Sequence, residues 1–519
     1  MLRWEKIHII KNVGSSWFSL GFNILVGIFL SPFILHRLGD AAYGIWVLIF
    51  SVTGYYGLFD LGIRSSVVRY VSRFTAINDR QSLSKLVNTS LFSYTVIGGV
   101  TMAFTLAGMS YVNSWFRIPP EFARTSQVLF LMVGTSVALG FPLGVYSGIL
   151  EGLQRFYLLN LTNVGSTLLR AVFIVVALNY GYGLLMVAAI TVILPLLVSI
   201  LRAAIVVRIL PLNFGWRYVD RASLREMAGY SGTTFLIMIS FKLRFKTDEL
   251  VIGTLLSSAA ITYFSIADRL LDYASEVVSS LAQIFVPMSS QSDAVGDTAR
   301  LQKIFIAGNR ACAMIIFPIA AILVILGKSV IAVWVGEKYV PMSYPVMLVL
   351  LFPMTASLAQ GASSRILFGM ARHRTLSWIV FMEAIANLAL SIILIRPLGI
   401  VGDALGTAIP LSCTALFFYP RHMCRLLGMR VSSFLLQTYL LPIFLCAPLV
   451  AVLVGLHYWF VPRRYFELAL QLGAALAVYG LGVLWAFWTR RLWKVETVPP
   501  VPVESAAVLA FQGDVPRLD

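Results

Sequence analysis

Apolar stretches of about 18 residues or more recur along the whole chain, and this feature decides its class. Each stretch is long enough to cross a bilayer as a helix, which takes about 20 residues. Only 12% of the residues are charged, whereas a soluble domain has about 25%. The sequence therefore predicts an all-α polytopic membrane protein.

The apolar stretches predict fourteen transmembrane helices, separated by short polar or Pro- and Gly-containing segments. The last residues, 495–519, are rich in Pro and small side chains, so we expect a disordered cytoplasmic tail there. The predicted helices lie at 12–36, 41–63, 86–110, 122–149, 157–179, 183–207, 225–254, 261–288, 303–327, 341–368, 375–395, 399–420, 433–456 and 466–489.

The distribution of Lys and Arg predicts the orientation of these helices. If the N-terminus lies inside, the inside segments carry 24 basic residues and the outside loops carry 8. Cytoplasmic loops collect Lys and Arg, so both termini are expected in the cytoplasm. The same bias accounts for the net charge of +17 without a nucleic-acid partner, and we expect none.

Three pairs of short segments indicate an internal repeat of about 217 residues. HRLGDAAYGIW (36–46) resembles GTLLSSAAITYF (253–264), and LEGLQRFYLL (150–159) resembles LFGMARHRTL (367–376), where Gly152 matches Gly369. GLLMVAAIT (183–191) resembles GIVGDALGT (399–407). Because the repeat holds six helices, the two halves share one orientation, and such parallel repeats bind substrate between them. The predicted units are therefore two six-helix lobes, two added helices and the tail, at 1–210, 211–430, 431–494 and 495–519.

The predicted helix at 225–254 carries five charges, at Lys242, Arg244, Lys246, Asp248 and Glu249. The repeat aligns position 244 with the middle of the first helix, so these charges are expected near the bilayer centre. There, ionisable groups cost about 2.5–3.5 kcal/mol each and are normally functional. A polar loop at 242–249 is the alternative, but it would invert every later segment and place their basic loops outside.

Further ionisable residues lie in or beside other predicted helices. Asp268, Asp272 and Glu276 form an acidic stripe in helix 261–288. Asp60 and Arg64 are four residues apart at the end of helix 41–63, and Arg170 lies inside helix 157–179.

Two interpretations of these charges remain open. They could neutralise one another and hold the helices at 225–254 and 261–288 together. Alternatively, the cations could line a water-filled cavity and bind a phosphate head group, with the acids serving charge balance or ion coupling. No ATP-binding motif or metal-spaced His cluster is present, so we expect no cofactor or metal; H⁺ and Na⁺ stay open as coupling ions.

Four motifs resemble a known family: LSPFILHRLGDAAYGIW, LFDLGIRSSVVRYVSR, KTDELVIGTLLSSAAITYFSIADRL and VPMSS. Together they resemble the polysaccharide transporters of the multidrug/oligosaccharidyl-lipid/polysaccharide exporter superfamily. The resemblance implies a bacterial inner-membrane flippase for undecaprenyl-pyrophosphate-linked oligosaccharides of O-antigen, capsule or exopolysaccharide. It further implies membrane lipids, a polysaccharide polymerase and chain-length machinery as partners. In its cationic cavity, Lys242, Arg244 and Lys246 would contact substrate, with Arg170 and Arg64 as further candidates.

Two other functions are weighed against the flippase. A cation-coupled multidrug exporter of the same fold typically concentrates acids, and helix 12–36 contains none. A membrane glycosyltransferase or ligase would need a large outside loop, but the longest one is about residues 326–341. We therefore expect a transporter and not an enzyme.

Overall fold

The computed structural model describes residues 2–489 and 491, except 211–212, 222, 226, 228–238, 240–246, 371 and 373. Its described residues form α-helices joined by short 3-10 and π-helical segments. The helices before residue 210 are α1 (Leu2–Leu38), α2 (Asp40–Gly54), α3 (Ile63–Ala76), α4 (Arg80–Trp115), α5 (Ala123–Gly152), α6 (Phe156–Asn179) and α7 (Leu184–Ile209). Those after residue 247 are α9 (Asp248–Leu255), α10 (Ser258–Ala282), α11 (Phe285–Ala294), α12 (Thr298–Trp334), α13 (Val340–Leu358), α14 (Gly361–Gly369), α15 (Arg374–Cys413), α16 (Tyr419–Leu426), α17 (Val431–Trp459) and α18 (Tyr465–Trp488).

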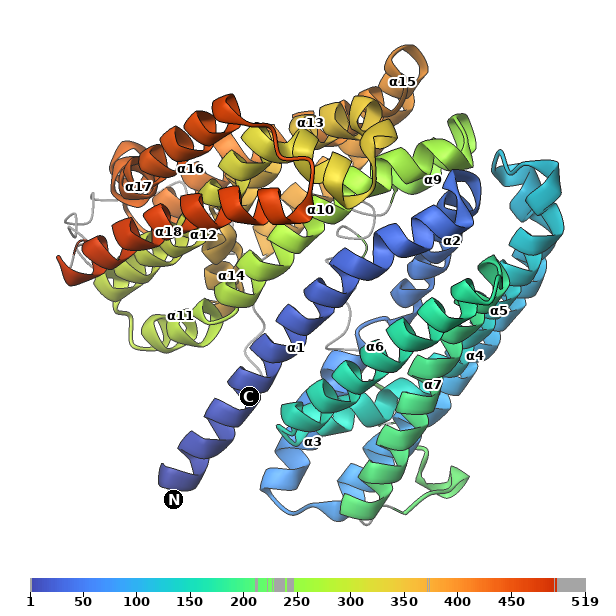
Figure 1. Cartoon of the computed structure of the whole chain (residues 1–519). Helices are drawn as coiled ribbons and strands as arrows, with labels where there is room; N and C mark the ends of the chain where they lie inside the picture. The colour runs from blue at the N-terminus through green and yellow to red at the C-terminus, as the bar shows by residue number, and fades with distance from the viewer. Residues whose placement is uncertain are drawn as a thin grey trace.

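The helices form two groups (Figure 1), with α3 to α7 in one and α10 to α18 in the other. α1 runs along the boundary between the groups and packs against α6. The last two helices, α17 and α18, pack against each other and against α12. They are therefore an addition to the second group.

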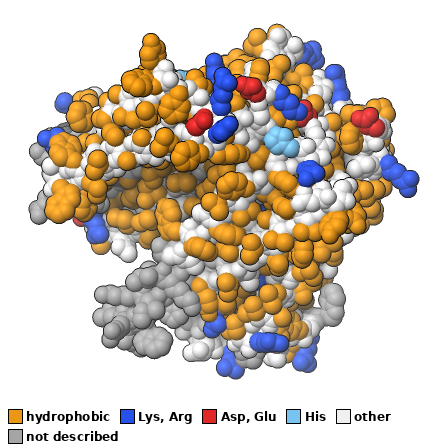
Figure 2. All heavy atoms as spheres, viewed as in Figure 1, with side chains coloured by type: hydrophobic (Ala, Val, Ile, Leu, Met, Phe, Trp, Pro, Cys, Tyr) orange, Lys and Arg blue, Asp and Glu red, His pale blue; other side chains and the backbone are white. Residues whose placement is uncertain are grey.

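The surface of the molecule is largely apolar. In Figure 2 hydrophobic side chains cover most of the visible face, and charged side chains gather toward the upper part and the lower edge. Large apolar residues such as Phe29, Phe104 and Leu440 are more than half exposed. A surface of this kind suits lipid contact, because soluble proteins rarely expose such extensive apolar patches.

Eleven described helical stretches are long and apolar enough to span a membrane. One of them, Thr375–Leu426, has 52 residues, whereas about 20 residues are enough for one crossing. It contains a kink at Gly399 with φ of 61°, so it provides two crossings. α10 is not among the eleven because of its charges, and most of the predicted helix 225–254 lies outside the described residues. The structure confirms the all-α polytopic class. Counting the kinked stretch twice and adding α10 and the predicted helix 225–254 gives the fourteen helices expected.

The two halves repeat the same local structures 218 residues apart. Asp79 caps α4 by accepting a 3.0 Å hydrogen bond from the backbone of Ser82, and Asp297 caps α12 by accepting one of 2.8 Å from Arg300. The residue before each cap has a left-handed backbone, with φ of 56° at Asn78 and 68° at Gly296. An aspartate at this position satisfies a backbone N–H that would otherwise lack a partner.

The matched glycines of the repeat make equivalent close contacts. A Cβ atom on Gly152, the last residue of α5, would lie 2.9 Å from the carbonyl oxygen of Val68. One on Gly369, the last residue of α14, would lie 2.5 Å from the carbonyl oxygen of Val286. Each glycine therefore permits a tight crossing of two helices, which explains why both repeats have glycine at this position.

Among the described residues, the two halves share a hydrophobic core at one end. There, Leu35 and Ile45 of the first half belong to the same buried cluster as Phe264 and Trp334 of the second. At the other end each half has a separate core, one around Val71 and the other around Phe305 and neighbouring residues. The shared core lies at the predicted outer side, because it includes the α1–α2 junction. The chain is therefore closed at that side and divided at the predicted cytoplasmic side.

Candidate substrate cleft and coupling site

Hydrogen bonds close the predicted outer end of the cleft between the halves. Asp40 accepts from Lys338 at 3.0 Å and from the hydroxyl of Tyr339 at 2.5 Å. The Trp334 indole donates to the carbonyl of Ile28 at 2.6 Å. We call this set of residues the outer clasp: Ile28, Asp40, Trp334, Lys338 and Tyr339.

The helices α2 and α10 meet at this end through a two-fold-like contact. Thr262 donates from its hydroxyl to the carbonyl of Asp40 at 2.7 Å. A Cβ atom on Gly44 would overlap the carbonyl of Ser258. Residues 40 and 258 are repeat partners, as are 44 and 262. Each half therefore presents the same surface to the other, as expected for an isologous interface.

Two arginines from different halves, Arg170 and Arg269, lie within electrostatic range of each other. Arg170 lies on α6, which is tied to α1 by the 2.7 Å hydrogen bond from Thr167 to Asn23. Arg269 lies on α10 and stacks over the Tyr273 ring at 5.3 Å, and Tyr273 itself lies directly against Gly27 of α1. The charges of Arg170 and Arg269 are close enough to repel each other. Arg170 was predicted as a cleft residue, whereas Arg269 emerges only from the structure.

A second charged group lies toward the predicted cytoplasmic end of the first half. Arg64 forms a 2.5 Å ion pair with Glu151, and Asp60 accepts a hydrogen bond from Tyr94. Burial alone would lower the pKa of the Arg64 guanidinium, but the hydrogen bond and charge of Glu151 outweigh burial and raise it. Arg202 is held nearby by hydrogen bonds that include 2.8 Å to Thr162.

The direct partners in this group are Glu151 for Arg64 and Tyr94 for Asp60, although Asp60 and Arg64 are four residues apart in the sequence. The chain is not helical between them, because Leu61 and Gly62 have φ angles of 50° and 79°. The four-residue spacing therefore does not place them one turn apart. Arg64 is half exposed, with a side-chain accessibility of 52%, and stays available to a ligand.

Buried polar side chains gather between α9 and α15 in the second half. Thr407 donates toward the two carboxylate oxygens of Asp248, at distances of 3.2 and 3.1 Å. Ser391 donates to the amide oxygen of Asn387 at 3.1 Å. Asp403 is fully buried, and neither of its carboxylate oxygens has a hydrogen-bond partner among the described residues.

This cluster brings several acidic groups into one dry site. Asp403 interacts electrostatically with Asp248 and Glu249, which are 6% and 3% exposed. Buried carboxylates in such proximity are not all ionised unless a cation or proton balances them. Among the described residues no group of three or more His, Cys, Asp or Glu has the arrangement of a metal site. The hydroxyl and amide oxygens of Thr407 and Asn387, however, add ligands of the type that hard cations prefer. We call Asp248, Glu249, Asn387, Asp403 and Thr407 the acidic cluster.

Of the remaining predicted site residues, three lie outside the described part of the chain and three lie on α10. Lys242, Arg244 and Lys246 lie outside the described residues, so their roles stay predictions. Asp272 and Glu276 both lie within electrostatic range of Arg269, on the same helix. Asp268 is partly exposed on this helix and takes part in further interactions.

The sequence already carried signals for the residues that were missed. Asp403 is an acid inside an apolar segment, and such acids are uncommon enough to mark a site. Arg269 stands in the predicted acidic stripe. The sequence did not reveal which residues these side chains meet, because that depends on packing between helices far apart in the chain.

This fold, with two groups of helices, matches the folds of solved membrane transporters. It resembles the lipid II flippase MurJ in its inward closed conformation, with a TM-score of 0.71 and 14% identity, over 93% of this chain and 100% of that one. It also resembles a multidrug resistance transporter of the MATE family, inward-facing, with a TM-score of 0.67 and 15% identity over 80% of this chain and 94% of that one. An outward-facing MATE transporter gives a lower TM-score of 0.59, at 14% identity over 82% and 96% of the two chains.

The family follows from the sequence comparison. A family model described as polysaccharide biosynthesis protein matches residues 34–344, and the chain belongs to this family. A candidate O-antigen transporter of Shigella flexneri is 28% identical over 156 residues, or 30% of this chain. The match spans 36% of that protein, so its substrate is not transferred directly.

Proposed function

We propose that the protein moves an undecaprenyl-pyrophosphate-linked oligosaccharide across the bacterial inner membrane. The cargo would be a repeat unit of O-antigen, capsule or exopolysaccharide. The observation that carries this proposal is the pair Arg170 and Arg269, which lie on different halves within electrostatic range of each other. Within the described residues neither forms an ion pair, although both lie inside a membrane fold. A polyanionic head group would relieve their repulsion.

The pyrophosphate would enter from the side at which the two hydrophobic cores are separate. An arginine binds phosphate through a planar fork of donors, and two arginines together offset more of the charge than one. Because they belong to different halves, an anion bound by both draws the halves together. Opening the outer clasp would then release the head group on the other side, while the lipid tail stays in the bilayer.

The acidic cluster is the proposed coupling site. A proton or Na⁺ ion held by Asp248, Asp403 and Thr407 would neutralise buried charge, and its loss would change how α9 and α15 pack. Coupling ions commonly bind near the midplane of repeat-built transporters. The same cluster favours the second candidate function, a cation-coupled multidrug exporter, because it is the acidic site that such a protein would need.

The proposed setting is the inner membrane of a bacterium, with both termini in the cytoplasm. A polysaccharide polymerase and chain-length machinery would receive the cargo on the far side. The basic residues of the predicted inside segments support the proposed orientation, and the proposed partners depend on the proposed cargo.

The experiment compares variants in a strain that lacks the chromosomal gene. Arg170→Ala and Arg269→Ala should reduce surface glycan and cause lipid-linked precursor to accumulate in the cytoplasmic leaflet, at normal protein abundance. Arg463→Ala, on an exposed loop, is the matched control. If glycan display stays normal in both variants and in the double variant, but resistance to cationic drugs depends on Asp403, the exporter replaces the flippase.

A further inference from the structure

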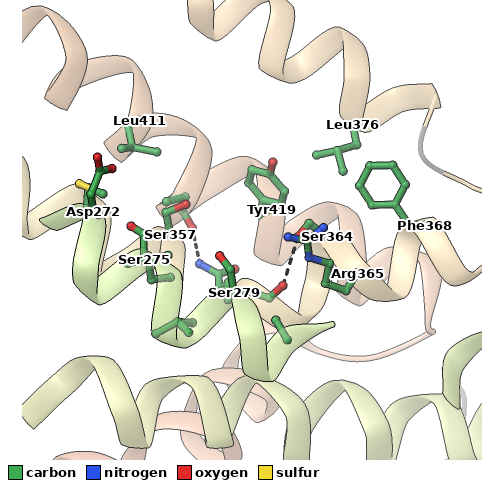
Figure 3. Close-up of a pocket in the computed structure, with 17 residues that line it drawn as sticks. Asp272, Ser275, Ser279, Ser357, Ser364, Arg365, Phe368, Leu376, Leu411 and Tyr419 are labelled. Carbon is green, nitrogen blue, oxygen red and sulfur yellow. Dashed lines mark hydrogen bonds between the residues drawn. The ribbon is translucent and has the colours of Figure 1, made fainter. Parts of the chain in front are cut away.

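A pocket of about 370 Å³ lies inside the second half (Figure 3), and it begins at Asp272, about one helical turn along α10 from Arg269. Its walls come from α10, α13, α14, α15, the π-helical segment Thr414–Phe418 and α16. Small-molecule sites typically measure about 300–1,000 Å³, so this pocket accepts a small group. We call it the serine pocket after four of its lining residues: Ser275, Ser279, Ser357 and Ser364.

The lining combines many hydrogen-bonding groups with no formal net charge. Asp272 supplies an acceptor and Arg365 supplies donors, while serine hydroxyls can both donate and accept. The four serines, Asp272 and Arg365 are all partly exposed, so their polar groups are accessible to a ligand. One acid against one base disfavours both a pyrophosphate and a cationic drug. The chemistry suits a neutral ligand with many hydroxyl groups.

Two aromatic residues of the pocket add flat apolar surfaces. Figure 3 shows Tyr419 near the middle of the pocket and Phe368 on the far side from Asp272, with Ser364 and Arg365 between the two rings. Aromatic rings offer large, rigid apolar faces, and Tyr adds a polar tip. A pyranose ring has the complementary surfaces, because its C–H groups form an apolar face and its hydroxyls lie at the rim.

A buried hydrogen bond holds the π-helical part of the pocket wall in place. Gln360 is 7% exposed and donates from its amide to the carbonyl of Ala415 at 2.7 Å, which fixes the π-helical segment against α13. π-helical turns are rare and occur frequently at functional sites.

Comparison of the two repeats shows that the polar residues which α10 contributes to the pocket are specific to this half. Asp272, Ser275 and Ser279 follow one face of α10 at spacings of three and four residues. Their counterparts 218 residues earlier are Gly54, Gly57 and Leu61. A role in packing common to both halves would not need hydroxyls and a carboxylate in one of them alone.

We propose that the serine pocket binds a sugar ring of the lipid-linked cargo, and so contributes to the choice of glycan. The assignment rests on the proposed function, since it supplies the second contact of the same substrate. The arginine pair would hold the pyrophosphate, which all cargoes share. The serine pocket would hold part of the sugar chain, in which cargoes differ.

The test uses full-length protein in proteoliposomes and two cargoes. One is undecaprenyl pyrophosphate carrying the complete repeat unit from the source organism, and the other carries only the first sugar. Ser279→Leu fills the pocket, Ser279→Ala removes one hydroxyl, and Asp272→Asn removes the charge. Ser199→Leu is the control, because Ser199 bonds only within its own helix in the first half.

Ser279→Leu should slow transport of the complete repeat unit by about tenfold relative to the single-sugar cargo, which corresponds to about 1.4 kcal/mol of lost transition-state binding. Ser279→Ala and Asp272→Asn should give smaller losses in the same direction. Equal effects on both cargoes, or none, would overturn the sugar site while leaving the flippase intact. If wild-type protein moves neither cargo, the proposed function itself is wrong. Thermal unfolding of each variant in nanodiscs separates these results from misfolding.

Discussion

The carboxylate of Asp40 accepts hydrogen bonds from Lys338 and Tyr339, which lie almost 300 residues further along the chain. This contact joins the two halves at the predicted outer end, where the shared core also lies. In the proposed transport cycle, the halves would separate at this end and meet at the other. Both hydrogen bonds would then have to break before a head group could leave on the outer side.

The first prediction concerns the outer clasp. Asp40→Ala removes both hydrogen bonds and should increase the outward-open population, whereas Lys338→Ala removes only an exposed pair worth about 1 kcal/mol or less. The latter should therefore shift the population by about fivefold at most. Spin labels at Arg37 and Glu337 report the distance between the halves. An unchanged distance distribution in Asp40→Ala would show that the apolar core alone keeps this end closed.

The second prediction concerns the close approach of Gly44 to Ser258. Alanine favours a helix by about 1 kcal/mol over glycine, so Gly44→Ala would stabilise α2 if packing did not matter. We expect the opposite, with reduced transport and a wider outer end, because the added methyl group overlaps the Ser258 carbonyl. Gly99→Ala is the control, since a Cβ there meets open space. Equal behaviour of the two variants would show that the contact is unimportant.

The third prediction concerns the acidic cluster. Asp403→Asn removes one of the mutually repelling carboxylates and should abolish the dependence of transport on a Na⁺ or proton gradient. Thr407→Val should weaken it, because it removes the hydroxyl that contacts Asp248. Transport into proteoliposomes with imposed gradients of each ion measures both. If wild-type transport ignores both gradients, the acids are balanced by the protein's own cations and have no coupling role.

The fourth prediction concerns topology. Reporter fusions at Asn78 and Arg217 should report cytoplasm, and fusions at Asn113 and Lys338 should report periplasm. Arg217 and Lys338 lie before and after the predicted helix at 225–254, so this pair tests whether that segment crosses the membrane once. Lys242, Arg244 and Lys246 of this segment lie outside the described residues. A cytoplasmic signal at Lys338 would mean that this segment crosses the membrane twice or not at all.

The repeat shows how far the sequence determines this fold. Gly152 and Gly369 match in sequence because each permits a helix crossing that no side chain would fit, so the repeat is visible in the sequence although each contact joins distant parts of the chain. The recurring apolar stretches similarly predicted the all-α membrane class.

The candidate sites were harder to predict because they depend on distant packing. Asp60 and Arg64 have helical spacing, but the left-handed backbone of Leu61 and Gly62 separates them, and a glycine alone does not reveal that break. Asp403 meets Asp248 only because α9 packs against α15. The sequence shows that such buried charges exist, and the fold decides which of them meet.

The most direct test of the account is the leaflet distribution of lipid-linked repeat units in proteoliposomes. With wild-type protein, cargo added on one side should reach the other leaflet. Arg170→Gln combined with Arg269→Gln should lower the rate to the protein-free level, while Arg37→Gln, outside the cleft, should leave it unchanged. The double replacement by Lys should retain part of the rate, because charge is kept and the forked geometry is lost. Wild-type rates in the double Gln variant would contradict the cationic cleft.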